Sequence, residues 1–458
     1  MARAAKKQKE LTPEEKLAQA LVPVEEQPYP IPENWCWTTL HYISSHISDG
    51  SHNPPKNSGK GIPLLSAKNI HNRIIDYNNV DRWILEDEWI EENKRTLIAK
   101  GDVLITIVAT IGRVAVVSSN VPFALQRSVA TIKPLINSYY LSYYLESPYV
   151  QFFMNENAKG TAQKGFYLKA LDSLYCAVPP LAEQQRIVDR IESLFSKLDE
   201  AKEKAQSVID SYEDRKSAIL HQAFSGELTK EWRGKNCVTL DDWKYKYISE
   251  FAEVKGGKRL PKGTALIKEK TAHPYLRVTD FSENTINTSD LHYITDDVYS
   301  QIDRYIINST DVYISIVGTI GKCGTIPESL NGANLTENAA RIISEETTPR
   351  YLAKFLSSPS AQEDIKCRIR SATLGKLSIT NIKKIMVPLP SIKEQEVIAE
   401  ILDELFKKET KAKHVAEQTL VQIEETKKQI LADAFRGKLG TNSKENVSAM
   451  TLLTQLIK

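Results

Sequence analysis

The stretch that decides the fold runs from Leu181 to Gly226 and reads LAEQQRIVDRIESLFSKLDEAKEKAQSVIDSYEDRKSAILHQAFSG. A related stretch runs from Ile392 to Gly437 and reads IKEQEVIAEILDELFKKETKAKHVAEQTLVQIEETKKQILADAFRG. The Glu-Gln pair near each start and the Ala-Phe pair near each end are 211 residues apart. A spacing that holds over the whole stretch indicates that the chain contains two copies of one unit.

Both stretches are predicted to form long helices that pair through an apolar seam. In the first copy, apolar residues recur three and four positions apart from Ile191 to Ile219, which is the a/d pattern of a coiled coil. At about 1.5 Å per residue, each helix would make a rod of roughly 60 Å. Pro180 and Pro390 stand just before the two helices, and Gly226 and Gly437 stand just after them, so both helices are bounded. A bundle helix within a globular core is the alternative, and it would need a third helix of similar length.

The seam of the second copy is predicted to be weaker. Counting from Leu402, its positions include Glu409, Ala412, Thr419 and Thr426. Alanines at matching places in the two copies would let the helices approach closely.

The segments between the long helices repeat as well. The sequence GDVLITIVATIGRVAVV at 101–117 corresponds to TDVYISIVGTIGKCGTI at 310–326. We predict strands near 101–107 and 114–118, and a helix over 138–155 whose four tyrosines form a packed face rather than a platform for stacking bases.

The pattern divides the chain into two mixed α/β domains, each followed by a long helix, and therefore predicts an α+β fold. Residues 1–11 are predicted to be disordered, and the capping box at Thr12 begins a short helix. The predicted divisions are an N-terminal extension with that helix (1–30), a first globular domain (31–180), a first long helix (181–229), a linker (230–242), a second globular domain (243–389), a second long helix (390–440) and a tail with a short docking helix (441–458).

Composition narrows the class of function. The 458 residues include 60 Lys and Arg against 58 Asp and Glu, so any contact with nucleic acid must come from local basic patches. The five cysteines form no CxxC motif and have no nearby histidine pairs, which argues against a metal site and for a reducing compartment. No apolar run is long enough for a membrane span and the N-terminus shows no secretion signal, so we expect a cytoplasmic protein with no membrane partner.

The second domain opens with a basic loop, KGGKRLPKG, at 255–263. Its paired glycines would let the backbone approach a phosphate, and its cations would neutralise the charge. A solvated surface loop is the alternative. The candidate DNA contacts here are Gly256, Gly257, Lys258, Arg259 and Lys262.

The first domain has DGSHNPPK at the corresponding place, with candidate contacts at Ser51, His52, Lys56 and Lys60. Amino-methyltransferases use Asn-Pro-Pro followed by an aromatic residue that stacks on the flipped base. Lys56 follows the prolines here, and no glycine-rich cofactor-binding turn accompanies them. We therefore assign no catalytic residue to this chain.

Further polar residues follow matching apolar positions in the two copies. Among the residue types that read base edges, Arg suits guanine, Asn suits adenine and Asp suits cytosine. The two copies keep the apolar positions but carry different polar residues after them, which suggests one scaffold that reads two DNA sequences. Two cations after Gly turns, Arg113 and Lys322, are either phosphate contacts or parts of hairpin turns. The other candidates are Ser66, Lys68, Asn69, Gln126 and Arg127 in the first copy, and Arg277, Thr279 and Asp280 in the second.

These motifs together resemble the specificity subunit of a type I restriction–modification system. The resemblance covers nearly the whole chain and rests on VPPLAEQQRI and VPLPSIKEQEVI before the long helices, AFSGELT and AFRGKL at their ends, and DGSHNPP, GGKRLPKG and the paired strand motifs. The helix starts and ends are specific together, whereas each strand motif alone is weak. The second copy lacks DGSHNPP and has Glu337-Asn338 near the place of Gln126-Arg127, so base-reading residues cannot be transferred by alignment.

The resemblance implies two target recognition domains related by pseudo-twofold symmetry and separated by a long antiparallel two-helix coiled coil that sets their spacing. Its implied partners are double-stranded DNA, two modification subunits that bind S-adenosylmethionine and methylate adenine and, where present, two restriction subunits that use ATP and Mg. No cofactor is expected on this chain. The alternatives are a stand-alone DNA-modifying enzyme and a coiled-coil tether without a DNA role.

Overall fold

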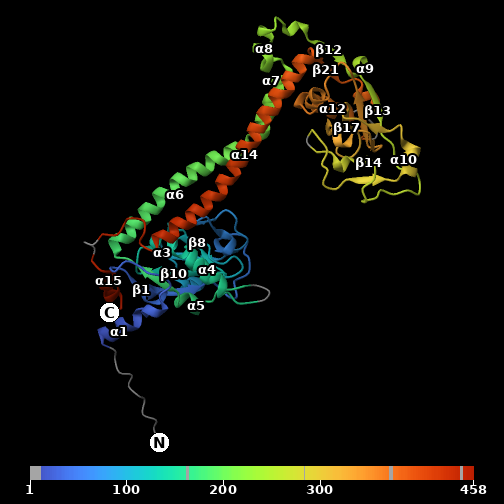
Figure 1. Ribbon diagram of the computed structural model, residues 1–458. Helices are drawn as coiled ribbons and strands as arrows, with labels where there is room; N and C mark the ends of the chain where they lie inside the picture. The colour runs from blue at the N-terminus through green and yellow to red at the C-terminus, as the bar shows by residue number, and fades with distance from the viewer. Residues whose placement is uncertain (1–11, 161–163, 283, 371–374, 444–446, 458) are drawn as a thin grey trace. The chain divides into compact units, whose positions relative to one another are not determined.

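A computed structural model describes residues 12–160, 164–282, 284–370, 375–443 and 447–457 (Figure 1). The chain divides into two compact units. Unit 1 comprises Met1–Lys204 with Thr419–Lys458, and unit 2 comprises Ala205–Gln418. Each unit therefore contains one globular domain and a part of both long helices. The disorder expected for residues 1–11 lies outside the described residues.

Unit 1 contains a mixed α/β domain built around an antiparallel four-stranded sheet. Its strand order is β2-β10-β7-β8, and a second sheet with the order β6-β3-β9 includes a parallel pair, β3 with β9. Its main elements are α1 (Pro13–Ala20), β1 (Cys36–Thr39), β2 (Ser44–Asp49), β3 (Ile62–Leu65), β4 (Ile70–His71), β5 (Ile74–Ile75), β6 (Trp83–Ile84), α2 (Glu86–Thr96), β7 (Val103–Thr106), β8 (Val114–Val116), β9 (Ala124–Leu125), β10 (Val129–Pro134), α3 (Ser138–Leu145), α4 (Pro148–Glu156), α5 (Leu168–Asp172), β11 (Tyr175–Val178), the start of α6 (Leu181–Asp210) and α15 (Ala449–Leu456).

Unit 2 repeats this architecture. The sheet β13-β20-β17-β18 corresponds to the first four-stranded sheet, and β14 pairs in parallel with β19 as β3 does with β9. Its elements are α7 (Tyr212–Phe224), α8 (Lys230–Lys235), β12 (Lys244–Tyr247), α9 (Ile248–Phe251), β13 (Glu253–Gly256), β14 (His273–Leu276), β15 (His292–Ile294), α10 (Asp296–Ile302), β16 (Ile306–Ile307), β17 (Val312–Ser315), β18 (Cys323–Thr325), β19 (Ala333–Leu335), β20 (Ala339–Ile343), α11 (Pro349–Leu356), α12 (Pro359–Arg370), α13 (Ile379–Ile382), β21 (Met386–Leu389) and the start of α14 (Ile392–Ala434).

One local expectation changes in detail. The helix predicted over 138–155 is two helices, α3 and α4, because Pro148 cannot continue a helix and instead begins the second one with Ser147 as its N-cap. Of the four tyrosines, Tyr139 is half-exposed and the other three are buried, so the predicted packed face is confirmed. The capping box at Thr12 and the docking helix in the tail, α15, are both present.

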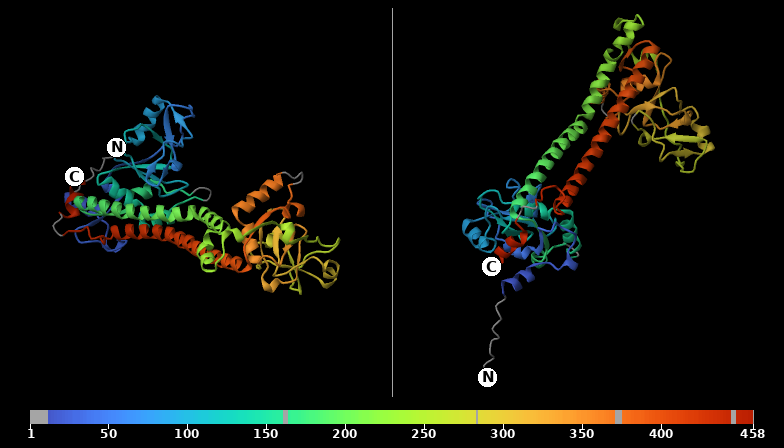
Figure 2. Two further views of the ribbon diagram at one scale, coloured as in Figure 1. Left: turned by 90° about the horizontal axis from the view of Figure 1, so that it is seen from above. Right: turned by 60° about the vertical axis from the view of Figure 1, so that its left-hand side comes forward.

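The first long helix, predicted over 181–229 as one element, is divided at Ser211 into α6 and α7, and the second is α14. The two run antiparallel within each unit, and both views of Figure 2 show them side by side. In unit 1, Lys202 is paired with Glu424, at 2.7 Å. In unit 2, Arg215 is paired with Glu409, also at 2.7 Å. Glu409 occupies the seam position predicted for it, and with Arg215 it forms a partly buried ion pair that fixes the register of the two helices.

The seam of the second long helix differs from the prediction. Ala412 and Thr426 are exposed, and the neighbouring residues Lys413 and Lys427 turn inward instead. The Lys413 ammonium lies 4.7 Å from the centre of the Tyr212 ring, and the Lys427 ammonium lies 5.1 Å from the centre of the Phe195 ring. The lysines fit there because their long stems cover apolar surface while their charges meet the ring faces.

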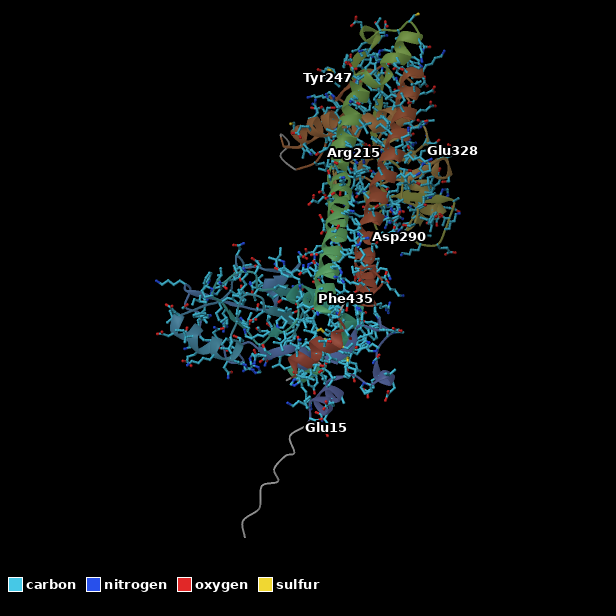
Figure 3. The ribbon with its side chains drawn as sticks, turned by 90° about the vertical axis from the view of Figure 1, so that its left-hand side faces the viewer. Glu15, Arg215, Tyr247, Asp290, Glu328 and Phe435 are labelled. Carbon is cyan, nitrogen blue, oxygen red and sulfur yellow. The ribbon has the colours of Figure 1, made fainter. Side chains whose placement is uncertain are left out.

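Each domain is fixed to its own long helix by the same buried contacts. The Trp35 indole donates to the Glu183 carboxylate at 2.9 Å, and the Trp243 indole donates to Glu394 at 3.0 Å. Each domain also packs on the end of the other long helix. In unit 1, Phe435 lies 5.0 Å from the ring of Tyr144, and Figure 3 labels Phe435 at this end of α14.

The segment 230–242, predicted as a linker, is structured. It forms α8 and a 3-10 turn at Leu240–Asp242. Arg233 on α8 donates to Glu394 at 2.8 Å, and the Arg233 side chain is only 9% exposed. This segment therefore completes the junction between the second domain and its helix.

Candidate nucleic-acid interface

The fold of unit 1 brings three candidate segments together, and we call residues 49–52, 65–69 and 125–127 the first cluster. The Ser51 amide donates to the Leu125 carbonyl at 2.7 Å, and the Arg127 amide donates to the Ser51 carbonyl at 3.0 Å. The Gln126 amide donates to the Leu65 carbonyl at 2.8 Å. These backbone bonds join loops that are far apart in the sequence.

Unit 2 assembles the corresponding segments in the same way, and we call residues 256–259, 276–280 and 335–337 the second cluster. The Lys258 amide donates to the Leu335 carbonyl at 2.8 Å, and the Thr336 amide donates to the Leu276 carbonyl at 3.0 Å. Both clusters lie at the end of the parallel strand pair in their domain.

A glycine makes the close approach of these segments possible in each cluster. A Cβ atom on Gly50 would lie 2.1 Å from the Leu125 carbonyl oxygen, and one on Gly257 would lie 2.1 Å from the Thr336 carbonyl oxygen. Gly257 is therefore needed for the close contact between its loop and the backbone of residues 335–336, rather than for an approach to DNA. Gly256 has no such constraint, because its Cβ would meet only the Ile379 side chain at 3.5 Å.

Several candidates in the first cluster hold the loops together. Asn69 is 1% exposed, and its amide donates to the carbonyls of Asp76 and Asn79 while its oxygen accepts from the Ser66 amide. The Ser51 hydroxyl donates to Glu92 at 2.9 Å. Both donor positions of Asn69 are thus used inside the protein, and its position favours a structural role over the base-reading role expected from its residue type.

Other candidates in unit 1 are exposed, as His52 is, or half-buried, as Lys68 is. His52 contacts the Asp49 carboxylate at 2.7 Å, and Lys68 pairs with Asp81. Lys56, Lys60 and Arg127 are exposed, and none of them makes an ion pair with a carboxylate in the described part of the chain.

The second cluster holds its cations in ion pairs. Asp280 is 3% exposed and accepts from the Arg277 guanidinium at 2.6 Å, and this hydrogen bond raises the pKa of Arg277. The Arg259 guanidinium donates to Glu337 at 2.7 Å. Burial opposes ionisation of Glu337, but the hydrogen bond from Arg259 and its neighbours outweighs it, so the pKa of Glu337 is lowered.

Lys258 differs from these paired residues. Its ammonium lies 5.4 Å from the centre of the Tyr305 ring, and no carboxylate pairs with it among the described residues. Thr279 and Lys262 are also exposed. The second cluster therefore offers fewer unpaired cations than its residue types suggested.

Arg113 and Lys322 lie outside both clusters, after the turns of the hairpins β7–β8 and β17–β18. Lys322 donates to the Phe281 carbonyl at 2.5 Å, and Arg113 reaches the corresponding Ile70 carbonyl at 3.5 Å. The two roles predicted for these residues were phosphate contacts and parts of hairpin turns, and their contacts with carbonyls of their own domain favour the second.

The residue patterns gave no indication of Arg95, which contacts the Asp49 carboxylate beside His52. Arg95 lies on α2, more than forty residues along the chain from Asp49, and no motif surrounds it. The one available signal was the Asp that begins DGSHNPP, since a buried carboxylate requires a partner.

The described residues show no group of three or more His, Cys, Asp or Glu side chains that could hold a metal ion. Burial raises the pKa of the Cys36 and Cys323 thiols to about 12, so neither is a thiolate near neutral pH. None of the helices in the described ranges is both long enough and apolar enough to cross a membrane.

Comparisons with known proteins agree with this arrangement. The family model described as "Type I restriction modification DNA specificity domain" matches residues 51–209 and 240–420. The chain is similar to the EcoBI specificity subunit of Escherichia coli, with 27% identity over 62% of this chain and 63% of that protein. It is also similar to the EcoKI specificity subunit of Escherichia coli K12, with 23% identity over 82% of each chain.

Solved structures show the same fold. The HsdS subunit from Thermoanaerobacter tengcongensis superposes with a TM-score of 0.62 and 17% identity, covering 91% of this chain and all of the other. A chain from a structural study of complex assembly and conformational transition of the type I R-M system gives a TM-score of 0.64 at 17% identity, covering 90% of this chain. The two matched segments of the family model span more than half of the sequence, and the protein belongs to the family of type I restriction–modification DNA specificity proteins.

Proposed function

We propose that this chain is the noncatalytic subunit that gives a type I restriction–modification complex its DNA sequence specificity. Each globular domain, residues 31–180 and 243–389, reads one half of a split, asymmetric DNA site. The single observation that supports this proposal is the pair of clusters, which share two corresponding backbone hydrogen bonds and carry different side chains.

The candidate contacts differ in what they offer DNA. The exposed cations Lys56, Lys60 and Arg127 in unit 1, and Lys258 in unit 2, suit phosphates or guanine edges. Arg259 uses only its Nε–H on Glu337 and keeps its other donors for DNA, whereas Arg277 donates through two of its nitrogens to Asp280, so the two are candidates for oriented contacts. Asn69 and Asp280 support the loops that present these groups.

The partners follow from the family. Two modification subunits would supply S-adenosylmethionine and the methylation of adenine, and restriction subunits, where present, would supply ATP- and Mg-dependent cleavage. This chain would contribute the choice of sequence and the surface on which those subunits assemble. It would neither bind these cofactors nor perform chemistry.

The test is a methylation map. The purified chain is combined with its modification subunits and S-adenosylmethionine, and methylated adenines are located by sequencing of a randomised DNA library. We expect a two-part asymmetric motif, and no methyl transfer by this chain alone. Methylation by the chain when mass spectrometry finds no partner would establish the stand-alone enzyme. A complex that methylates without sequence preference would support the alternative that this chain is a coiled-coil tether without a role in DNA recognition.

A further inference from the structure

The backbone hydrogen bonds of the two clusters show that His52 in unit 1 and Arg259 in unit 2 occupy equivalent places. The residue before each of them, Ser51 or Lys258, donates its amide to the carbonyl of the leucine that ends the second strand of the parallel pair. Each of those residues in turn follows a glycine that has no room for a Cβ atom. The two side chains therefore start from the same backbone frame, and they differ in chemistry.

Arg127 and Glu337 form a second equivalent pair. Each follows a residue, Gln126 or Thr336, whose amide donates to the carbonyl of the last residue of β3 or β14. Unit 1 thus has a cation at this place and unit 2 has a carboxylate. In unit 2 the two places form an ion pair, whereas in unit 1 both carry basic side chains.

The Glu337 carboxylate is held by one donor on each of its oxygens. Arg259 donates its Nε–H to Oε1 at 2.7 Å, and the Thr336 hydroxyl donates to Oε2 at 3.0 Å. The Glu337 side chain is 29% exposed, whereas the Arg259 side chain is 79% exposed. The guanidinium therefore projects outward from a fixed carboxylate, and its Nη1 and Nη2 groups have no partner in the described part of the chain.

The carboxylate decides which kind of DNA group Arg259 can meet. A phosphate that approached the guanidinium would also approach the negative charge of Glu337, and the two like charges would repel each other. The edges of bases carry no net charge, so they do not meet this repulsion. The ion pair is therefore suited to a base edge, whereas a cation without a carboxylate partner is suited to phosphates.

The remaining donors of Arg259 match guanine. With Nε engaged by Glu337, the two Nη groups form a planar fork of donors. In the major groove guanine presents two adjacent acceptors, O6 and N7, whereas adenine presents one acceptor and one donor. Both hydrogen bonds of the fork can consequently form with guanine alone among the purines.

We propose that Arg259 reads one guanine in the half-site of the second domain through its two Nη groups, and that Glu337 is the positioning residue. Glu337 directs the guanidinium to the base and keeps it from phosphates. This inference rests on the proposed function and adds to it the identity of one base pair. At the equivalent places the first domain has His52 and Arg127, so the two half-sites differ there.

The first test compares methylation maps of the assembled complex. We expect the wild-type motif to contain a guanine, on either strand, at one position that becomes degenerate in Arg259→Ala while all other positions stay the same. Arg259→Lys keeps the charge without the planar fork and should lose the same preference. Glu337→Ala should lower the preference for guanine at that position by roughly tenfold. Glu346→Gln is the control, because Glu346 forms another exposed ion pair of unit 2, with Lys246 at 2.5 Å.

The second test measures binding of the assembled complex to synthetic DNA in which 7-deazaguanine replaces that guanine. The analogue has carbon in place of N7 and so lacks one acceptor. Wild-type affinity should fall by roughly tenfold, as expected for a lost hydrogen bond to a charged group, and Arg259→Ala should show no further loss. Glu337→Ala should also steepen the slope of log affinity against log salt by about 1, because the released guanidinium can meet a phosphate.

A motif that Arg259→Ala leaves unchanged, or an equal loss with 7-deazaguanine in the wild type and in Arg259→Ala, would overturn the assignment of guanine. An unchanged guanine preference and salt slope in Glu337→Ala would overturn the positioning role and leave only a surface ion pair. Methylation by the wild-type complex without sequence preference would instead contradict the proposed function, so the two failures are distinguishable.

Discussion

The two units use the same buried hydrogen bonds to attach their domains to the long helices, but the side chains of their clusters make different contacts. Trp35 binds Glu183 as Trp243 binds Glu394, and two backbone hydrogen bonds of the first cluster, those of Ser51 and Gln126, have counterparts from Lys258 and Thr336 in the second. The exposed charges do not correspond, because Arg127 lacks an ion pair with a carboxylate in the described part of the chain, whereas Arg259 is paired with Glu337. The comparison shows that the frame depends on buried hydrogen bonds, while the outer side chains are free to differ.

The largest expected effect comes from breaking the junction of unit 2. Arg233→Met leaves the Glu394 carboxylate buried without its ion-pair partner. Removal of one partner of a buried pair destabilises by about 3–5 kcal/mol. Hydrogen exchange with mass spectrometry should show loss of protection around Trp243 and little change around Trp35.

The exposed Lys230 on the same helix gives a matched control, Lys230→Met. Adding Glu394→Gln to Arg233→Met should recover part of the protection, because the buried group is then neutral. If protection is lost equally around Trp35 and Trp243, the two junctions are not independent and the comparison fails.

A smaller effect is expected from the glycines in the clusters. Gly257→Ala forces a Cβ atom against the Thr336 carbonyl and should destabilise unit 2 by about 1–3 kcal/mol, as overpacking does elsewhere. Gly256→Ala, one residue away, meets only an ordinary side-chain contact and serves as the control. Thermal melts of the two variants measure the difference, and equal melting temperatures would show that the close approach is not required.

The charge difference between the clusters can be measured on DNA. Lys258→Ala should lower the slope of log affinity against log salt by roughly 1, the amount expected for one lost phosphate contact. Arg259→Ala should change it less, because that guanidinium is held by Glu337. DNA titrations of the assembled complex at several salt concentrations test both variants. An unchanged slope for Lys258→Ala would show that the loop at 255–263 is a solvated surface that does not contact DNA.

The smallest effect concerns pH. Burial raises the pKa of Glu183 above its ordinary value, although Trp35, Arg186 and Thr441 partly oppose the shift. A carboxyl with a raised pKa binds more protons in the folded state than in the unfolded one. Its contribution to stability therefore falls as pH rises from the ordinary glutamate value through the raised one.

Glu183→Gln should flatten this dependence while it keeps an oxygen acceptor for the Trp35 indole. Urea unfolding between acidic and neutral pH, followed by hydrogen exchange in unit 1, measures the change. An identical pH profile for the variant would show that Glu183 does not titrate in this range.

The repeat, the two long helices and their capping follow from sequence patterns, because periodic apolar residues and terminal prolines and glycines act over a few positions. The same local rules placed the β7 and β8 strands and the helix at Thr12. They failed for the seam position of Ala412, because the side that a helix buries depends on the ring of Tyr212 on the opposite helix.

The sequence by itself determined that this protein has two copies of a domain and a helix, and which short segments present polar residues in each copy. Only the tertiary structure decided which of those residues face outward. Asn69 and Asp280 are buried because loops distant in the sequence close over them, and Tyr245 is exposed because the segment before it folds against Glu394 instead of returning over β12. Such outcomes depend on contacts between residues far apart along the chain, which local patterns do not encode.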